Sequence, residues 1–134
     1  MANLKLIQWN LNGMSSRYCF LQKLIHDYEP ELLCIQETNF KGSSCIQLKN
    51  YNIFYKNRVI CERASGGVAI YVHNRYTASI INLNTNLEAT AVQVLINDKK
   101  IHNCKSYLII NMLSMCTKNT IPNPTSSISN IYEV

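Results

Sequence analysis

The chain has 134 residues, of which 47% are hydrophobic and 16% charged, and this composition excludes a disordered protein. It predicts one small domain or part of a larger one. The 13 Lys and Arg against 8 Asp and Glu give a net charge of +5, which suits a phosphate-bearing partner but is not specific for one.

The first half of the sequence predicts a strand, a helix and a second strand. Bulky apolar residues indicate a buried strand at Leu4–Trp9, and Leu32–Gln36 has the same character. Between them, apolar residues recur every three or four positions in 17–28, which predicts a helix that ends before Pro30. Such a unit pairs its two strands in parallel, so both strands should end at the same edge of a sheet.

From Tyr51 onward the sequence favours short strands and turns. Strands are predicted at 51–56, 68–72, 78–83 and 89–96, with one or two more within 101–113. After Cys116 the chain is polar and contains two prolines, so we expect no fixed structure there. The predicted architecture is α/β with one mixed sheet and a flanking helix, comprising a domain at 1–113 and a disordered tail at 114–134.

No membrane or zinc-binding segment is expected. The longest apolar run, Tyr107–Met115, is too short and too polar to span a bilayer, and residues 1–10 lack the apolar core of a secretory signal. The six cysteines include no C-x-x-C pair, which argues against zinc ribbons and thioredoxin-type motifs. We therefore expect a nuclear or cytoplasmic protein with reduced thiols, and not a secreted one.

Polar residues follow both strands of the predicted parallel pair. Asn10 and Asn12 come directly after the first strand, and Glu37 comes after the second, at the edge where open α/β sheets bind ligands. A carboxylate beside a buried strand favours a cation partner, and Mg²⁺ is commonly held by one or two carboxylates with waters and phosphate. The alternative is ordinary turn chemistry, because Asn-Gly is a favoured turn pair and an exposed Glu needs no function.

Three motifs in order, W-N-x-N-G within residues 7–13, Q-E-T within 32–38 and S-G-G-V-A-I within 64–72, resemble a known family. They are similar to the first half of the endonuclease/exonuclease/phosphatase superfamily, and most of all to the endonuclease domain of non-LTR retrotransposons. The resemblance covers residues 3–96. It implies part of an α/β sandwich, Mg²⁺-dependent hydrolysis of DNA phosphodiesters, DNA as partner, and no small-molecule cofactor.

The resemblance also implies roles for individual residues. Glu37 matches the metal-binding glutamate, and Asn10 matches the asparagine at the metal and phosphate. Asn12 matches a catalytic position that is often Asp in the abasic-site enzymes.

A second set of residues matches the DNA-facing side of the family. Ser65 begins the turn that precedes a strand there, and Arg58 and Arg63 are candidates for phosphate contacts. The alternative for both arginines is an ordinary solvated surface position.

Later motifs of the family are absent from this sequence. We find no tyrosine strand of the N-x-Y-x-P-P type, no G-D-x-N and no S-D-H, and none of the three histidines follows Ser-Asp. The resemblance therefore predicts an N-terminal fragment that binds Mg²⁺ weakly or not at all and is inactive alone. Because the family's second sheet would be missing, an open sheet face could promote self-association. The alternatives are a phosphatase of the same superfamily, a non-catalytic nucleic-acid or protein-binding remnant, and an unrelated α/β domain.

Overall fold

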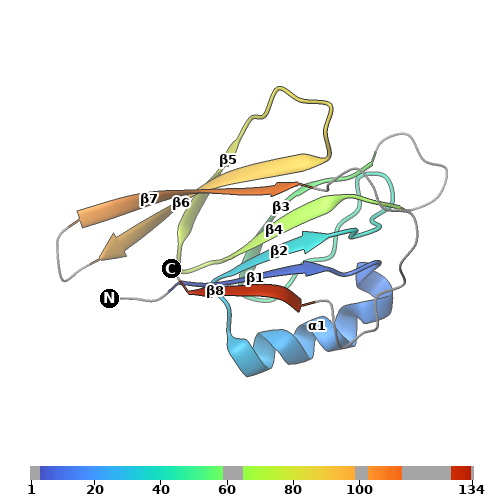
Figure 1. The fold of residues 1–134 in the computed structure, drawn as a ribbon, viewed down its shortest axis with the longest axis horizontal. Coiled ribbons are helices and arrows are strands. Elements are labelled where there is room, and N and C mark those ends of the chain that lie inside the picture. The colour runs from blue at the N-terminus through green and yellow to red at the C-terminus, as the bar shows by residue number, and fades with distance from the viewer. Residues whose placement is uncertain (1–3, 59–64, 99–102, 113–127, 134) are drawn as a thin grey trace.

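The computed structural model describes residues 4–58, 65–98, 103–112 and 128–133. In chain order its elements are β1 (Lys5–Asn10), α1 (Met14–Tyr28), β2 (Leu32–Gln36), β3 (Tyr51–Lys56), β4 (Val68–His73), β5 (Thr77–Ile81), β6 (Ala89–Asp98), β7 (Asn103–Met112) and β8 (Ile128–Glu133) (Figure 1). They form a five-stranded sheet in the order β3-β4-β2-β1-β8 and a three-stranded sheet in the order β5-β6-β7. The α/β class predicted from the sequence is confirmed.

The strand–helix–strand unit forms as predicted. β1 and β2 pair in parallel, and β4 continues the sheet antiparallel to β2. Helix α1 buries Leu21 and Leu24 against the sheet and ends at Tyr28. The next residue, Glu29, has a left-handed φ of 45° and directly precedes Pro30. Among the described residues, no helix is long and apolar enough to cross a membrane.

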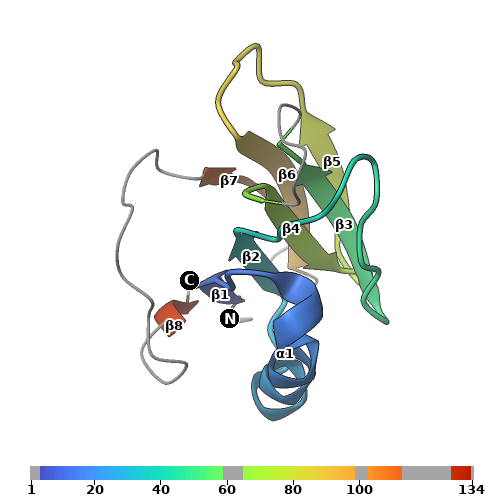
Figure 2. The same cartoon turned by 90° about the vertical axis from the view of Figure 1, so that its right-hand side faces the viewer.

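The five-stranded sheet has a hydrophobic core on each face, because successive strand residues point to opposite sides. Ile35 of β2 and Tyr71 of β4 belong to the core beneath α1. Their neighbours Cys34 and Ile70 belong to the opposite core. Figure 2 shows α1 on one face of this sheet and β5, β6 and β7 on the other.

The second sheet corrects the expectation of a single mixed sheet with an open face. Val92 and Val94 of β6 are fully buried against the face that carries Cys34 and Ile70. The face that we expected to promote self-association is therefore covered in the described part of the chain. Local sequence could not reveal this, because an alternating strand fits either sheet until its pairing partners are known.

The C-terminal residues correct a second expectation. Ile128–Glu133 was predicted to lack fixed structure, but it forms β8 and pairs antiparallel with β1. Without β8, the outer backbone groups of β1 would lie at a sheet edge without partners. The prediction was wrong because the prolines and serines that precede this segment in the sequence are typical of disordered chain. Residues 113–127, which make up most of the predicted tail, lie outside the described residues.

Candidate functional site

Asn10 and Glu37 lie at one end of the five-stranded sheet. Asn10 is the last residue of β1 and is in register with Gln36, the last residue of β2, so Glu37 follows directly beside it. The predicted common edge is confirmed. We call residues 10–13 and 36–39 the carboxyl edge, because the two parallel strands end there.

Backbone hydrogen bonds extend the pairing of β1 and β2 beyond the strands. The N–H of Leu11 donates to the carbonyl of Gln36 at 2.9 Å, and that of Gly13 donates to the carbonyl of Glu37 at 2.8 Å. The N–H of Met14, at the start of α1, donates to the carbonyl of Thr38 at 3.0 Å. The loop that carries Asn12 is thereby fixed alongside the loop that carries Glu37.

Left-handed backbone is concentrated at the carboxyl edge. Asn12, Glu37 and Asn39 have φ values of 47°, 51° and 53°. Asparagine tolerates this region, but glutamate adopts it at a cost and only where surrounding contacts enforce it. The hydrogen bond from the Gly13 N–H to the Glu37 carbonyl supports this conformation.

Three polar side chains of the carboxyl edge, those of Asn10, Asn12 and Glu37, are accessible to solvent. Glu37 and Asn10 are half-buried, and Asn12 is exposed. Within the described ranges, none of these three side chains takes part in a hydrogen bond or an ion pair. A carboxylate oxygen and an amide oxygen are ligands that Mg²⁺ accepts.

The ligand set is small. In the part of the chain that the structure describes, no three His, Cys, Asp or Glu residues form a group that could hold a metal ion. One carboxylate with waters and a substrate phosphate nevertheless matches a common way of holding Mg²⁺. The residues present fit a weakly held, largely hydrated ion.

The turn at Gly66 and Gly67 packs against the carboxyl edge. The N–H of Thr38 donates to the Gly67 carbonyl at 3.3 Å, and that of Asn39 donates to the Gly66 carbonyl at 2.8 Å. A Cβ on Gly67, whose φ is 86°, would lie 2.8 Å from Oγ1 of Thr38. Glycine is therefore required here by both conformation and space.

The predicted DNA-facing residues have different environments. Ser65 is half-exposed and directly precedes the glycine turn. Arg58 is exposed, with 39% of its side chain accessible, and it forms an ion pair with Glu88 while its guanidinium lies against Gly66. Arg63 lies outside the described residues. Direct phosphate contacts by these three residues stay a prediction.

Glu88 is a residue that the sequence analysis missed. Its carboxylate joins Arg58 and the N–H of Gly67, although 21 residues or more separate it from both. No motif or spacing in the sequence signals such a long-range contact.

The sequence matches the model of the Endonuclease/Exonuclease/phosphatase family over residues 7–129, which is most of the chain. The chain belongs to this family. A comparison with curated protein sequences finds no significant match.

Several solved structures have a similar fold. The catalytic domain of Xenopus laevis APE2 is 18% identical, with a TM-score of 0.61 over 82% of this chain and 45% of that one. AP endonuclease LMAP from Leishmania major is 14% identical, with a TM-score of 0.57 over 83% and 40%. The 3′ phosphatase NExo from Neisseria, bound to a product DNA hairpin, is 17% identical, with a TM-score of 0.52 over 69% and 37%. The chain therefore spans less than half the length of each of these structures.

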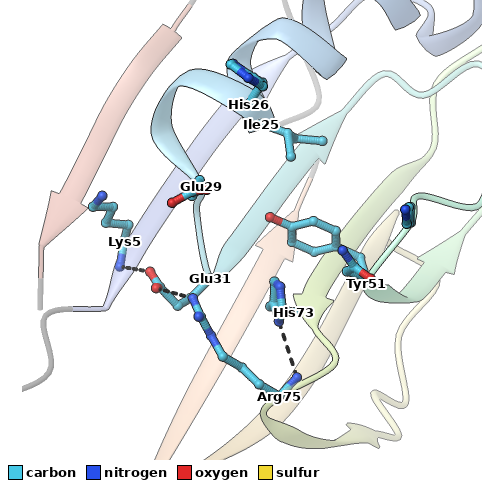
Figure 3. A pocket seen from close by; sticks show the side chains of 10 residues that line it. Lys5, Ile25, His26, Glu29, Glu31, Tyr51, His73 and Arg75 are labelled. Carbon is cyan, nitrogen blue, oxygen red and sulfur yellow. Dashed lines mark hydrogen bonds and ion pairs between the residues drawn. The ribbon is translucent and has the colours of Figure 1, made fainter.

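A pocket of about 450 Å³ lies at the other end of the same sheet (Figure 3). Its lining includes Lys5 at the start of β1, Tyr51 at the start of β3 and His73 at the end of β4. Glu31 is buried there, where it accepts the Lys5 N–H at 2.7 Å and pairs with Arg75 at 2.6 Å. Burial and the nearby Arg75 lower the pKa of His73. The Glu31 carboxylate is thus already engaged by Lys5 and Arg75. In addition, open α/β sheets bind ligands at the opposite end, where the parallel strands terminate.

Proposed function

We propose that this member of the Endonuclease/Exonuclease/phosphatase family is the N-terminal part of a Mg²⁺-dependent endonuclease domain, of the non-LTR retrotransposon type, that hydrolyses DNA phosphodiesters. By itself it cleaves DNA little or not at all. One observation carries the proposal: Glu37 lies on left-handed backbone beside the end of β1, and its carboxylate has no hydrogen-bond or ion-pair partner among the residues that the structure describes. The motifs around Asn10, Glu37 and Gly67 supply the retrotransposon comparison.

The proposed roles follow from the chemistry of the side chains. Glu37 and the amide oxygen of Asn10 would hold the ion. When bound, Mg²⁺ offsets negative charge on the phosphate. Asn12 lies on the exposed loop and offers an amide that can donate to a phosphate oxygen without adding repulsion.

Several features support DNA as the substrate. The net charge is +5, which favours a polyanion. One structural neighbour is named as an AP endonuclease, and another is described as bound to a product DNA hairpin. Ser65 directly precedes the turn that packs on the carboxyl edge, and Arg58 and Arg63 belong to the same region of the sequence.

Low activity alone follows from the small set of catalytic groups. The sequence contains neither G-D-x-N nor S-D-H. Groups that act together in catalysis are strongly non-additive, so the loss of several leaves little rate enhancement. A nucleic-acid-binding remnant without a metal role is the second candidate, and the positive charge favours it.

DNA binding and plasmid nicking should be measured together for the wild type, Glu37→Gln and Glu29→Gln. Glu29 is a matched control, because it is an exposed glutamate with a φ of 45° at the end of α1. Both substitutions remove one negative charge, but only Glu37 lies at the carboxyl edge.

At constant ionic strength, wild type and Glu29→Gln should bind DNA more tightly than Glu37→Gln in Mg²⁺ but not in EDTA. Nicked plasmid should not accumulate. If the affinity for DNA falls with salt but is unchanged by Mg²⁺ and by Glu37→Gln, the result would support the nucleic-acid-binding remnant instead. Nicking that requires Mg²⁺ and Glu37 would refute the claim that this chain is inactive alone.

A further inference from the structure

Glu88 links the two sheets at the candidate site. Its Oε2 accepts the N–H of Gly67 at 2.9 Å, and its Oε1 forms an ion pair with Nε of Arg58. The Glu88 side chain is only 17% exposed. A single carboxylate, just ahead of β6, thus holds both the turn before β4 and the residue two positions after β3.

The segment before Glu88 is also tied to the first sheet. Nζ of Lys56, the last residue of β3, donates to the carbonyls of Thr85 at 3.0 Å and Leu87 at 2.7 Å. These bonds fix the backbone from which the Glu88 side chain extends. The backbone at Glu88 is therefore fixed within reach of the Gly66–Gly67 turn.

The contact continues from Gly67 to Glu37. The carbonyls of Gly66 and Gly67 accept the N–H groups of Asn39 and Thr38, the two residues after Glu37. The loop that contains Glu37 is held by this turn on one side and by the loop after β1 on the other. These contacts support the left-handed backbone of Glu37, whose φ is 51°.

We propose that Glu88 is a positioning residue for the carboxyl edge: it fixes the Gly66–Gly67 turn, and through that turn it holds Glu37 in the conformation that binds a divalent cation. This inference rests on the proposed function for its cation. Arg58 completes the contact by neutralising Glu88, so its first role is to hold Glu88 and the turn in place.

The chain provides a matched control for Glu88. Glu31 is also a largely buried carboxylate, with 11% exposure, that accepts one backbone N–H and pairs with one arginine. It lies at the opposite end of the sheet. Removing either carboxylate should destabilise the protein, but only Glu88 should affect the carboxyl edge.

The first arm measures amide hydrogen exchange without metal at Thr38 and Asn39. Glu88→Ala should speed exchange at both amides by about tenfold or more through local opening. Glu31→Ala should leave both within about twofold of wild type after correction for global stability. Glu88→Gln keeps an acceptor for Gly67 and should stay within about threefold. Unchanged exchange in Glu88→Ala, or equal acceleration in Glu88→Ala and Glu88→Gln, would refute this hydrogen-bonded route.

The second arm measures Mg²⁺ affinity from NMR shifts of the amides at 10–13 and 36–39. Glu88→Ala should weaken binding about tenfold, the usual effect of losing a residue that orients a ligand. Glu31→Ala should not. If Glu88→Ala and Glu31→Ala weakened Mg²⁺ binding equally, the cause would be general destabilisation, and the proposal would be overturned. If the wild type itself shows no saturable shifts, the proposed function fails, and the exchange arm still decides whether Glu88 positions the loop.

Discussion

The turn at Gly67 allows a quantitative test of how closely β4 approaches the loop after β2. We expect Gly67→Ala to destabilise the protein by two separable effects. The first is backbone strain at a φ of 86°, which costs about 1–2 kcal/mol for a residue with a Cβ. The second is overpacking, because the new Cβ would lie 2.8 Å from Oγ1 of Thr38, a side chain that is almost fully buried. Overpacking costs about 1–3 kcal/mol.

Gly42→Ala separates these effects. Gly42 has a φ of 60°, and a Cβ there would meet no atom within 4 Å, so this variant has the strain without the clash. Urea unfolding followed by the fluorescence of Trp9, the one tryptophan of the chain and a buried residue, gives both free energies of unfolding. Gly67→Ala should lose about 1–3 kcal/mol more than Gly42→Ala.

A double variant sharpens the same test. In a Thr38→Ala background the clashing oxygen is gone, so Gly67→Ala should cost no more than Gly42→Ala does. Equal losses for Gly67→Ala and Gly42→Ala in the wild-type background would refute the close packing. The close packing would also be refuted if Gly67→Ala lost the same free energy of unfolding in the Thr38→Ala background as in the wild type.

Three further variants probe the two cores and the far end of the sheet by the same urea titration. Tyr71→Phe removes the buried hydroxyl that donates to the Ile46 carbonyl at 2.7 Å, so it should cost about 1–3 kcal/mol, and an unchanged midpoint would contradict that bond. Burial raises the pKa of Cys34 from 9.0 to about 12. The unfolded chain therefore loses this proton first, and stability falls as pH rises between these values. Over this pH range the free energy of unfolding of the wild type should fall, relative to that of Cys34→Ala, by about 1.4 kcal/mol per pH unit. A difference that stays constant with pH would exclude a buried neutral thiol. Glu31→Ala leaves Arg75 without its carboxylate and should cost about 1–3 kcal/mol, so a neutral result would show that the pair contributes nothing.

Patterns within short stretches of sequence correctly predicted the strand–helix–strand unit and the strand after the glycine turn. The helical spacing before Pro30 and the two apolar runs at Leu4–Trp9 and Leu32–Gln36 gave the parallel unit, and this unit placed Asn10 and Glu37 at one edge. The strand after the glycine turn was also predicted, because Val68–His73 is continuously apolar up to its last residue.

The missed features all depend on contacts between distant residues. The second sheet forms because β6 pairs with β5 and β7 and then buries valines against the first sheet, and no local pattern specifies those partners. Strand β8 is identified by its pairing with β1, more than 100 residues earlier. Glu88 resembles any surface glutamate until the structure brings it to Gly67.

We propose that the carboxyl edge binds a divalent cation through Glu37. The most direct measurement is an NMR titration of the labelled chain with Mg²⁺, which maps the amides that shift in the wild type and in Glu37→Gln. We predict saturable shifts confined to residues 10–13, 36–39 and 65–67 in the wild type, and their loss in Glu37→Gln. Shifts that persist in the variant, or that gather around Glu31 at the opposite end of the sheet, would contradict the account.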